Sequence, residues 1–445
     1  MNQPDLHRPA PVSLRTAFRY WLKLGFISFG GPAGQIAMMH TELVERRRWI
    51  SEQRFLHALN YCMLLPGPEA TQLAIYIGWL LHKTRGGIVA GVLFVLPSLL
   101  ILTALSWIYM AYGSVPAVAA VLYGIKPAVV AIVLAAAWRI GKRTLKNGAL
   151  IALAAAAFVA ITLFHLPFPL IVAGAALIGL IGGRSWPALF QVGGGHPGQA
   201  ASYGPALIDD DSPTPDHARF SWPALLRVAL AGCALGTLAW LALALSTGAR
   251  APLAQMGWFF TKAAMLTFGG AYAVLPYVYQ GAVDNFHWLL PAQMIDGLAL
   301  GETTPGPLIM VVAFVGFVGA WSKAVFGTKL LAAGAAGATV ATFFTFLPSF
   351  LFILAGGPLV EATRDNIRMT APLTAISAAV VGVIVSLAVF FGMHVFWLDT
   401  PTPHLDLRAV LLGGMASIAL LRYQMGTIKL ILACAICGLV LSYLR

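Results

Sequence analysis

Two short motifs that break a helix recur inside apolar sequence in this 445-residue chain. Phe29-Gly30-Gly31 returns as Phe268-Gly269-Gly270, and Pro66-Gly67-Pro68 returns as Pro305-Gly306-Pro307. Because proline suits the first turn of a helix, the last proline of each Pro-Gly-Pro predicts a helix that restarts after a break. A helix that restarts presents free N–H groups and the positive end of its dipole, which together form a ready anion site.

Neutral hydrogen-bonding side chains lie next to both Pro-Gly-Pro turns. Such groups suit a tetrahedral oxyanion, which offers several acceptor oxygens and needs no metal. A simple proline kink would explain any single motif, but four motifs in register favour a binding site. We therefore predict that the substrate is bound by the turn glycines and their polar neighbours: Gly30, Gly31, Gly67, Thr71, Gln72, Gly269, Gly270, Thr303, Thr304 and Gly306.

Five ionisable residues in apolar segments are further candidates, because charge at membrane depth is costly. Lys126, near the middle of 117–138, either attracts an anion or is a packing charge paired with a carboxylate or backbone carbonyls. Lys23 and Lys262 match across the repeat and either converge on one cavity or, for Lys23, reach the interface. Glu69 and Glu302, beside the Pro-Gly-Pro turns, are either helix caps or, in a dry cavity, proton carriers.

The elements that must position these residues are membrane helices. Hydrophobic residues make up 59% of the chain, charged residues 10%, and the mean hydropathy is +0.82. Most of the long runs with few or no charges approach the ~20 residues that a helix needs to cross ~30 Å of hydrocarbon. These runs are 87–109, 117–138, 148–164, 222–247, 330–354, 372–394 and 426–443. The net charge of +12 comes from basic residues dispersed between apolar runs, which is typical of cytoplasmic loops and not of nucleic-acid binding.

An internal duplication sets the domain organisation. A shift of 239 residues lays Lys23, the Phe-Gly-Gly turn, Trp49 and the Pro-Gly-Pro turn on their second copies, and a shift of 251 lays Leu96-Pro97-Ser98 on Leu347-Pro348-Ser349. We expect an N-terminal repeat over 1–183, a flexible cytoplasmic linker over 184–221, a connecting transmembrane helix over 222–249 and a C-terminal repeat over 250–445. The linker contains three consecutive aspartates at 209–211, which we interpret as a solvated loop.

The charge bias predicts that the second repeat is inverted relative to the first. The segment 40–54 is rich in arginine, whereas its counterpart 279–293 has Asp284 and no Lys or Arg. Basic residues flank each broken segment of 12–85 on both sides, which favours re-entrant hairpins over full crossings. The expected fold is therefore an all-α polytopic membrane protein with two inverted repeats, each with two broken hairpins and about four transmembrane helices.

Motifs for other chemistry are missing from the sequence. There is no phosphate loop of the G-x-x-x-x-G-K-[ST] type, so we do not expect the protein to hydrolyse ATP. There is also no His-Glu-x-x-His motif and no His/Cys cluster, so we expect no bound metal or cofactor and no enzymatic activity. Arg15, Arg19 and Lys23 run through the first apolar segment, which argues against a cleavable signal peptide. Ion-coupled secondary transport is the preferred function, with an anion channel as the alternative.

Taken with these motifs, the sequence resembles the chromate ion transporter family in its long, bidomain form. The resemblance rests on Phe29-Gly30-Gly31-Pro32, Pro66–Gln72, Phe268–Tyr272, Pro305-Gly306-Pro307 and the run Ala378–Ile384, and covers nearly the whole chain except the linker and termini. It implies export of chromate from the bacterial cytoplasm through the inner membrane, chromate resistance, and sulfate as a close analogue. The expected partners are this oxyanion, the lipid bilayer, H+ as coupling ion in an antiporter, and a second copy in a homodimer.

Overall fold

The structure, a computed structural model, describes residues 9–29, 31–190, 203–213, 215–268, 270–362, 370–398 and 404–443. Apart from one two-residue strand pair, β1 (Trp397–Leu398) with β2 (His404–Leu405), the described elements are helices. Six of these helices are long and apolar enough to cross a membrane: Glu69–Tyr112, Pro116–Thr144, Phe168–Ser185, Trp222–Thr247, Leu330–Glu361 and Ala371–Phe396. The prediction of an all-α polytopic membrane protein is confirmed.

The first half begins with helices that are interrupted at the predicted motifs. The helix α1 (Leu14–Ile27) ends before the Phe-Gly-Gly turn, and α2 (Gly31–His40) continues into the π-helix η1 (Thr41–Arg46). The helix α3 (Glu52–Leu64) ends before the Pro-Gly-Pro turn, and α4 (Glu69–Tyr112) follows it. Three further helices complete this half and are followed by one helical turn: α5 (Pro116–Thr144), α6 (Gly148–Thr162), α7 (Phe168–Ser185) and α8 (Pro187–Phe190).

The helix α4 is two helices that meet at a sharp reversal. His82 and Lys83 leave the helical conformation, and Lys83 has φ +55°. After the reversal, the two pieces pack closely against each other. A Cβ added at Gly78 would lie only 2.5 Å from the Gly86 carbonyl oxygen and 2.6 Å from Ala90 Cβ. The first piece therefore forms a short hairpin with α3, and the second piece is the long apolar helix predicted over 87–109.

The second half repeats this order. The helices α10 (Pro252–Met265) and α11 (Ala271–Tyr279) flank the second Phe-Gly-Gly turn, and α11 continues into η3 (Gln280–Asn285). The helix α12 (Pro291–Thr303) precedes the second Pro-Gly-Pro turn, after which η4 (Leu308–Met310) leads into α13 (Val311–Ser322). Two long helices and two shorter ones follow: α14 (Leu330–Ala362), α15 (Thr370–Phe396), α16 (Leu407–Leu421) and α17 (Thr427–Tyr443).

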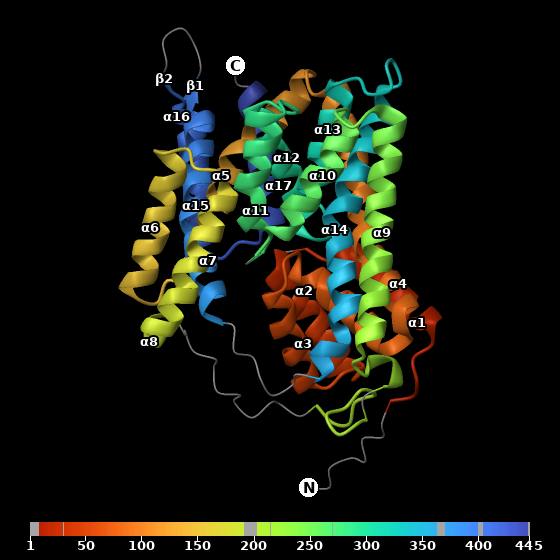
Figure 1. The fold of residues 1–445 in the computed structure, drawn as a ribbon. Coiled ribbons are helices and arrows are strands. Elements are labelled where there is room, and N and C mark those ends of the chain that lie inside the picture. The colour runs from red at the N-terminus through yellow and green to blue at the C-terminus, as the bar shows by residue number, and fades with distance from the viewer. Residues whose placement is uncertain are drawn as a thin grey trace, which may run out of the picture.

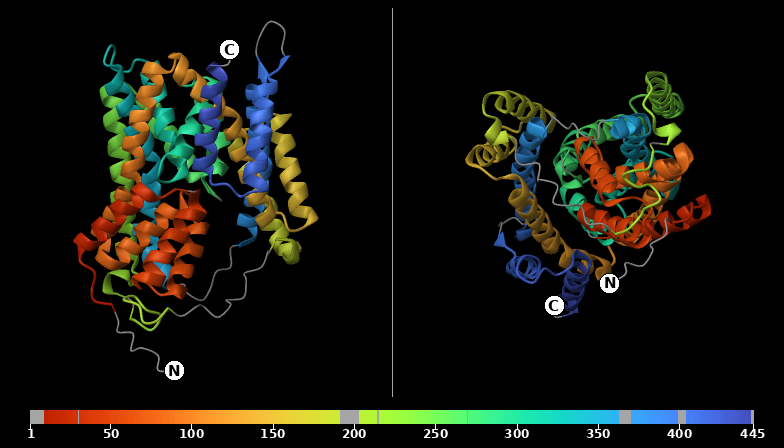
Figure 2. Two further views of the ribbon diagram at one scale, coloured as in Figure 1. Left: turned by 180° about the vertical axis from the view of Figure 1, so that it is seen from behind. Right: turned by 90° about the horizontal axis from the view of Figure 1, so that it is seen from below.

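The interrupted helices of the two halves occupy opposite ends of the molecule. Figure 1 shows α1, α2 and α3 in its lower part with the N-terminus, and α10 to α13 in its upper part with the C-terminus. The views in Figure 2 place α6, α7 and α15 to α17 in a separate group beside them. The two Pro-Gly-Pro turns lie between these two sets of short helices, where each is bonded to the other half.

The two halves are joined by a segment whose described residues, 203–213, contact the first half. One peripheral helix follows this segment. The 3-10 helix η2 (Asp216–Ala218) precedes α9 (Trp222–Thr247), which has no buried residue and packs on α14 and α10. Before it, Ile208 forms a parallel bridge with Ile50, and the amides of Leu207 and Ile208 donate to the carbonyls of Arg48 and Trp49. Residues 203–213 are therefore held against the first half, which corrects the expectation of a flexible linker along this stretch.

Candidate functional site

The two Pro-Gly-Pro turns are each bonded to the opposite half of the chain. The Gly67 N–H donates to the Thr267 carbonyl oxygen at 2.8 Å, and the Gly306 N–H donates to the Ser28 carbonyl oxygen at 2.7 Å. Thr267 and Ser28 are the residues just before the two Phe-Gly-Gly motifs, so these hydrogen bonds are reciprocal. We call the region where they meet the crossed turns: residues 28, 29, 31, 66–72, 267, 268, 270 and 304–307, with the side chains that contact them.

Both central glycines have a backbone that requires glycine. Gly67 has φ +122° and Gly306 has φ +107°. A Cβ added at Gly67 would lie 2.5 Å from Ser349 Oγ, and one at Gly306 would lie 2.7 Å from Ser98 Cβ. Each turn therefore packs on a serine of the other half, which comes from the repeated Leu-Pro-Ser of α4 or α14.

Polar side chains at the crossed turns are buried and only partly satisfied. Among the described residues at the crossed turns, five side-chain oxygens have no hydrogen-bond partner: Gln35 Oε1, Thr71 Oγ1, Gln72 Oε1, Ser98 Oγ and Ser349 Oγ. All five side chains are fully buried at 0% exposure. The amide nitrogens of the two glutamines are used, since Gln35 Nε2 donates to the Gly306 carbonyl oxygen at 2.6 Å and Gln72 Nε2 to that of Pro66 at 2.7 Å. Unsatisfied buried polar atoms are rare in native proteins and call for a ligand or water.

The predicted site residues occupy different positions around these turns. Thr71 and Gln72 lie at the centre, whereas Thr303 and Thr304 donate their hydroxyls to the carbonyl oxygens of Leu300 and Gly301 at 2.8 and 2.9 Å. The amides of Gly67 and Gly306 are engaged with carbonyls, so these two glycines connect the halves and have no free N–H for a ligand. Gly31 and Gly270 keep positive φ values of +71° and +97°. The predicted residues Gly30 and Gly269 lie outside the described residues.

Carboxylates stand beside both Pro-Gly-Pro turns, as predicted. Glu69 is the first residue of α4 and feels the charge of Arg143. Glu302 accepts a hydrogen bond from the Tyr272 hydroxyl, and Arg139 is the cation that acts on this pair. Arg139 and Arg143 are exposed and one helical turn apart on α5. Both guanidinium groups therefore lie on the same helix, α5.

Lys23 and Lys262 are not brought together by any contact among the described residues. Lys23 lines a cavity of about 400 Å³ with Tyr20, Glu42 and Arg46, between α1 and η1. Lys262 is exposed, and its ammonium lies 5.7 Å from the centroid of the Trp258 ring. The match across the repeat therefore does not produce one shared cationic pocket.

Lys126 has an acidic partner that sequence reasoning missed. Its Nζ lies 3.5 Å from Asp296 Oδ2 on α12, and the same oxygen accepts a hydrogen bond of 3.0 Å from the Tyr109 hydroxyl. The sequence left open whether Lys126 attracts an anion or is a packing charge paired with a carboxylate. The structure supplies such a carboxylate, that of Asp296. The signal that could have identified Asp296 is its place as the one carboxylate in the middle of the apolar stretch 291–301.

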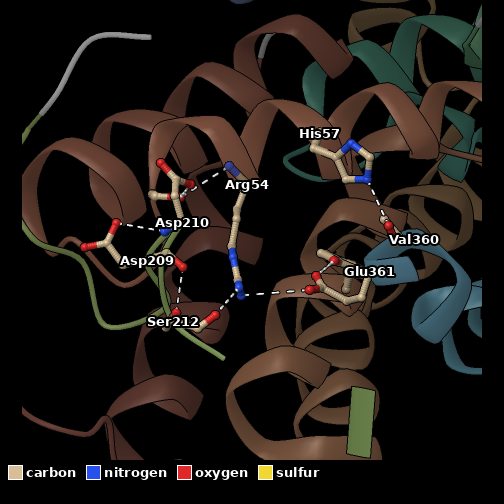
Figure 3. A network of polar contacts seen from close by, with 9 residues as sticks. Arg54, His57, Asp209, Asp210, Ser212, Val360 and Glu361 are labelled. Atoms are coloured by element: carbon tan, nitrogen blue, oxygen red, sulfur yellow. Dashed lines mark hydrogen bonds and ion pairs between the residues drawn. The ribbon is translucent and has the colours of Figure 1, made fainter. Parts of the chain in front are cut away.

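A second polar network lies at the lower end of the molecule, where the joining segment docks (Figure 3). Arg54 Nη2 donates to the Ser212 carbonyl oxygen at 2.8 Å, and Arg54 Nη1 lies 3.9 Å from Glu361 Oε2 at the end of α14. Ser51 donates to Asp210 Oδ1, and Asp209 accepts from the amides of Ala206 and Asp210. Asp210 thus bonds the first half through Ser51, while Asp210 and Asp211 stay exposed, as expected for a solvated loop.

Among the described residues, no group of three or more His, Cys, Asp or Glu side chains could hold a metal ion. The residues missed at the crossed turns are Gln35, Ser98 and Ser349. The two serines had a signal, since Leu-Pro-Ser recurs in both halves and a serine after a helix proline is an unusual element to duplicate. The sequence signal for Gln35 was weaker: it is the first long polar side chain after the Phe-Gly-Gly turn.

Comparison with known proteins agrees with this arrangement. The sequence profile of the chromate transporter family matches residues 15–180 and 254–439, one match in each half. The chain is 30% identical to the chromate transport protein of Cupriavidus metallidurans, covering 92% of this chain and 90% of the relative. It is 33% identical to the chromate transport protein of Pseudomonas aeruginosa over 84% of this chain and 80% of that protein. It is 30% identical to a probable chromate transport protein of Synechococcus elongatus, covering 91% of each.

No solved structure matches this chain. The family is one of transporters, which fits a membrane protein. The matches exclude the linker and leave both sets of turns inside the matched regions. The chain belongs to the chromate transporter family.

Proposed function

We propose that this protein is a secondary active transporter that exports chromate and similar tetrahedral oxyanions from the bacterial cytoplasm, and that the crossed turns hold the anion. The observation that carries the proposal is the set of five buried, unpartnered polar oxygens around two reciprocally bonded turns. Three of these oxygens are hydroxyls (Thr71, Ser98 and Ser349), which can donate to an oxyanion. The helix α4 adds the N–H groups of its first turn, which have no partner within the helix.

The charges around the turns suit a dianion. Glu69 and Glu302 would repel it when ionised, and we infer that Arg139 and Arg143, which lie one helical turn apart on α5, offset this repulsion. Guanidinium groups bind tetrahedral oxyanions through several N–H donors in a fixed fork. We infer that α5 supplies the positive charge and the broken turns supply the neutral hydrogen-bond donors.

The proposal includes an inverted repeat with re-entrant hairpins. It is supported by the reciprocal bonds from Gly67 and Gly306, and by the opposite placement of the short helices in Figure 1. The arginine-rich segment 40–54 and the docked linker lie at the same end as the N-terminus, which we assign to the cytoplasm. All four turns come from one chain, so a second copy is not required to complete the site.

Transport by purified protein in liposomes tests this function. With an imposed proton gradient and the membrane potential held at zero, vesicles containing the protein should accumulate radiolabelled chromate, and sulfate should compete. Thr71→Val should weaken this transport, whereas the matched control Thr261→Val should not, because Thr261 lies on the flank of α10 and bonds its own helix at Gly257. Vesicles that never concentrate the anion but release it down its gradient would identify a channel instead, and no flux of either oxyanion would overturn the proposal.

A further inference from the structure

The ion pair of Lys126 and Asp296 is a charged feature at membrane depth that lies outside the crossed turns. The Asp296 side chain is 5% exposed, its Oδ2 is shared by Lys126 and Tyr109, and its Oδ1 has no hydrogen-bond partner within the described residues. The Lys126 side chain is more open, at 28% exposure. The carboxylate is therefore enclosed, while the ammonium can still be reached by a ligand.

Together with Tyr109, the pair joins three helices: α5, α12 and the second piece of α4. From Asp296 the helix α12 continues to Glu302 and then to the Pro-Gly-Pro turn that holds Gly306. The repeat does not duplicate the pair, since Ser377 and His57 stand at the corresponding positions. An asymmetric charged pair in a symmetric scaffold points to function more than to folding.

Protonation of Asp296 and binding of an anion at Lys126 favour each other for an electrostatic reason. A proton on the carboxylate would leave Lys126 as an uncompensated charge at membrane depth, which is strongly unfavourable. An oxyanion that takes the place of the carboxylate removes this penalty. By thermodynamic linkage, if protonation of Asp296 raises the affinity for the anion, then binding of the anion raises the affinity of Asp296 for the proton by the same factor.

We propose that Asp296 takes up one proton when an oxyanion binds at Lys126, so that this pair couples proton binding to oxyanion binding. The proton comes from water and adds to a carboxylate oxygen of Asp296; Lys126 keeps its own proton and exchanges the carboxylate for the oxyanion. This inference rests on the proposed function and adds a second position for the anion, at Lys126, to the one at the crossed turns. It predicts that one proton and one dianion travel together, with the membrane potential driving the net negative charge outward, and so differs from the expected antiport.

The groups that face Asp296 are few. Lys126 from α5 and Tyr109 from α4 are the ionisable side chains that interact with it, and α13, α15, α17 and η4, which also pack on α12, contribute none within the described residues. On its own helix Glu302 lies farther along and is bonded to Tyr272. A proton linked to anion binding at this pair therefore has Asp296 as its acceptor.

Equilibrium binding of radiolabelled sulfate to the purified full-length protein tests the coupling, since sulfate stays a dianion across the range of interest. The wild-type affinity should fall as the pH rises, by up to roughly tenfold per pH unit for one linked proton. In weakly buffered solution, sulfate binding should take up protons. Asp296→Asn should bind sulfate with little pH dependence and no proton uptake, and Lys126→Gln should bind it more weakly at every pH.

Asp284→Asn is the matched control, because Asp284 is an exposed acid of the same half. It should keep the wild-type pH dependence. If Asp296→Asn does not fold, the double variant Lys126→Gln/Asp296→Asn removes both charges and should show no proton uptake. Sulfate binding without proton uptake in the wild type, or a full pH slope in either Asp296 variant, overturns the inference. A wild type that binds neither sulfate nor chromate overturns the proposed function itself.

Discussion

The backbone N–H of Gly306 donates across the boundary between the halves to the carbonyl oxygen of Ser28, 2.7 Å away. The equivalent bond from Gly67 to Thr267 is 2.8 Å long. The central amide of each Pro-Gly-Pro turn is thus hydrogen-bonded to a carbonyl oxygen just before the Phe-Gly-Gly turn of the other half. An unpaired backbone group in hydrocarbon costs several kcal/mol, so neither half could keep its broken turn at membrane depth alone. The two halves depend on each other for folding as well as for the site.

Alanine at either central glycine should therefore destabilise the protein. Gly67→Ala and Gly306→Ala place a side chain on a backbone with positive φ, which costs about 1–3 kcal/mol, and each new Cβ also strikes a serine of the opposite half. Thermal unfolding of the purified protein in detergent should show a lower melting temperature for both. Gly148→Ala, at the start of α6 with open space around it, should be neutral or slightly stabilising. Equal melting temperatures for all three variants would contradict the geometry of the turns.

The two buried serines should separate binding from stability. Ser98 and Ser349 hydroxyls have no partner within the described structure, so alanine at either position removes an unsatisfied group and should leave stability unchanged or raised. If the hydroxyls donate to the oxyanion, each substitution removes a charge-assisted hydrogen bond of about 1.5–3 kcal/mol, or roughly 10- to 150-fold in affinity. Titration with sulfate measures this change.

Ser106→Ala is the control for these serines. Its hydroxyl is also buried in α4, but it donates to the Leu102 carbonyl oxygen at 2.6 Å and is therefore satisfied. Its affinity for sulfate should equal that of the wild type. Unchanged affinity in both Ser98→Ala and Ser349→Ala would exclude these hydroxyls from the binding site.

The helices and their interruptions could be predicted from sequence because both depend on local spacing. The apolar runs 117–138 and 372–394 became α5 and α15, with ends that differ by a few residues. The Phe-Gly-Gly and Pro-Gly-Pro motifs end helices where they stand, since glycine and proline act on their own backbone. The repeat then indicated which breaks correspond.

The partners across the structure could not be predicted in the same way. Asp296 lies in the other half of the chain from Lys126, and nothing near either residue in the sequence indicates that they meet. The docking of Leu207 and Ile208 is made by backbone atoms, which every residue has, so a composition typical of a linker did not reveal it. Lys23 and Lys262 show the converse, because matching positions in a repeat do not guarantee matching surroundings.

The docked segment should be released when Arg54 is neutralised. Arg54 and Glu361 are buried side chains, 4% and 3% exposed, and Arg54 also bonds the Ser212 carbonyl oxygen. Arg54→Gln leaves the Glu361 carboxylate without this cation, and breaking a buried pair typically costs about 3–5 kcal/mol. Hydrogen exchange at the Leu207 and Ile208 amides should become faster. Arg219→Gln removes an ion pair that is mostly exposed and should leave exchange unchanged.

Acidification should loosen the same segment through His217, which lies outside the membrane-spanning helices. Burial lowers the pKa of the His217 imidazole below its usual value, and the nearby Lys83 lowers it further, while a hydrogen bond of 3.1 Å with the Trp79 carbonyl oxygen opposes the shift. The folded protein thus prefers the neutral ring. This preference stabilises the docked state above the unfolded pKa of about 6.5 and is lost as the pH falls through the folded value.

The expected result is faster exchange of the Ala218 amide, which bonds the Pro215 carbonyl oxygen, as the pH is lowered from about 7 to about 5 after correction for intrinsic rates. His217→Gln should abolish this dependence, since glutamine can keep a hydrogen bond to Trp79 but does not titrate. Titration of Glu42 can be distinguished from that of His217. The hydrogen bond with Arg47 lowers the pKa of Glu42, so this carboxylate is protonated only under more acidic conditions. A pH dependence that persists in His217→Gln would therefore assign the release to another group, whereas its loss would identify the His217 imidazole as the group whose titration loosens the contact with Trp79.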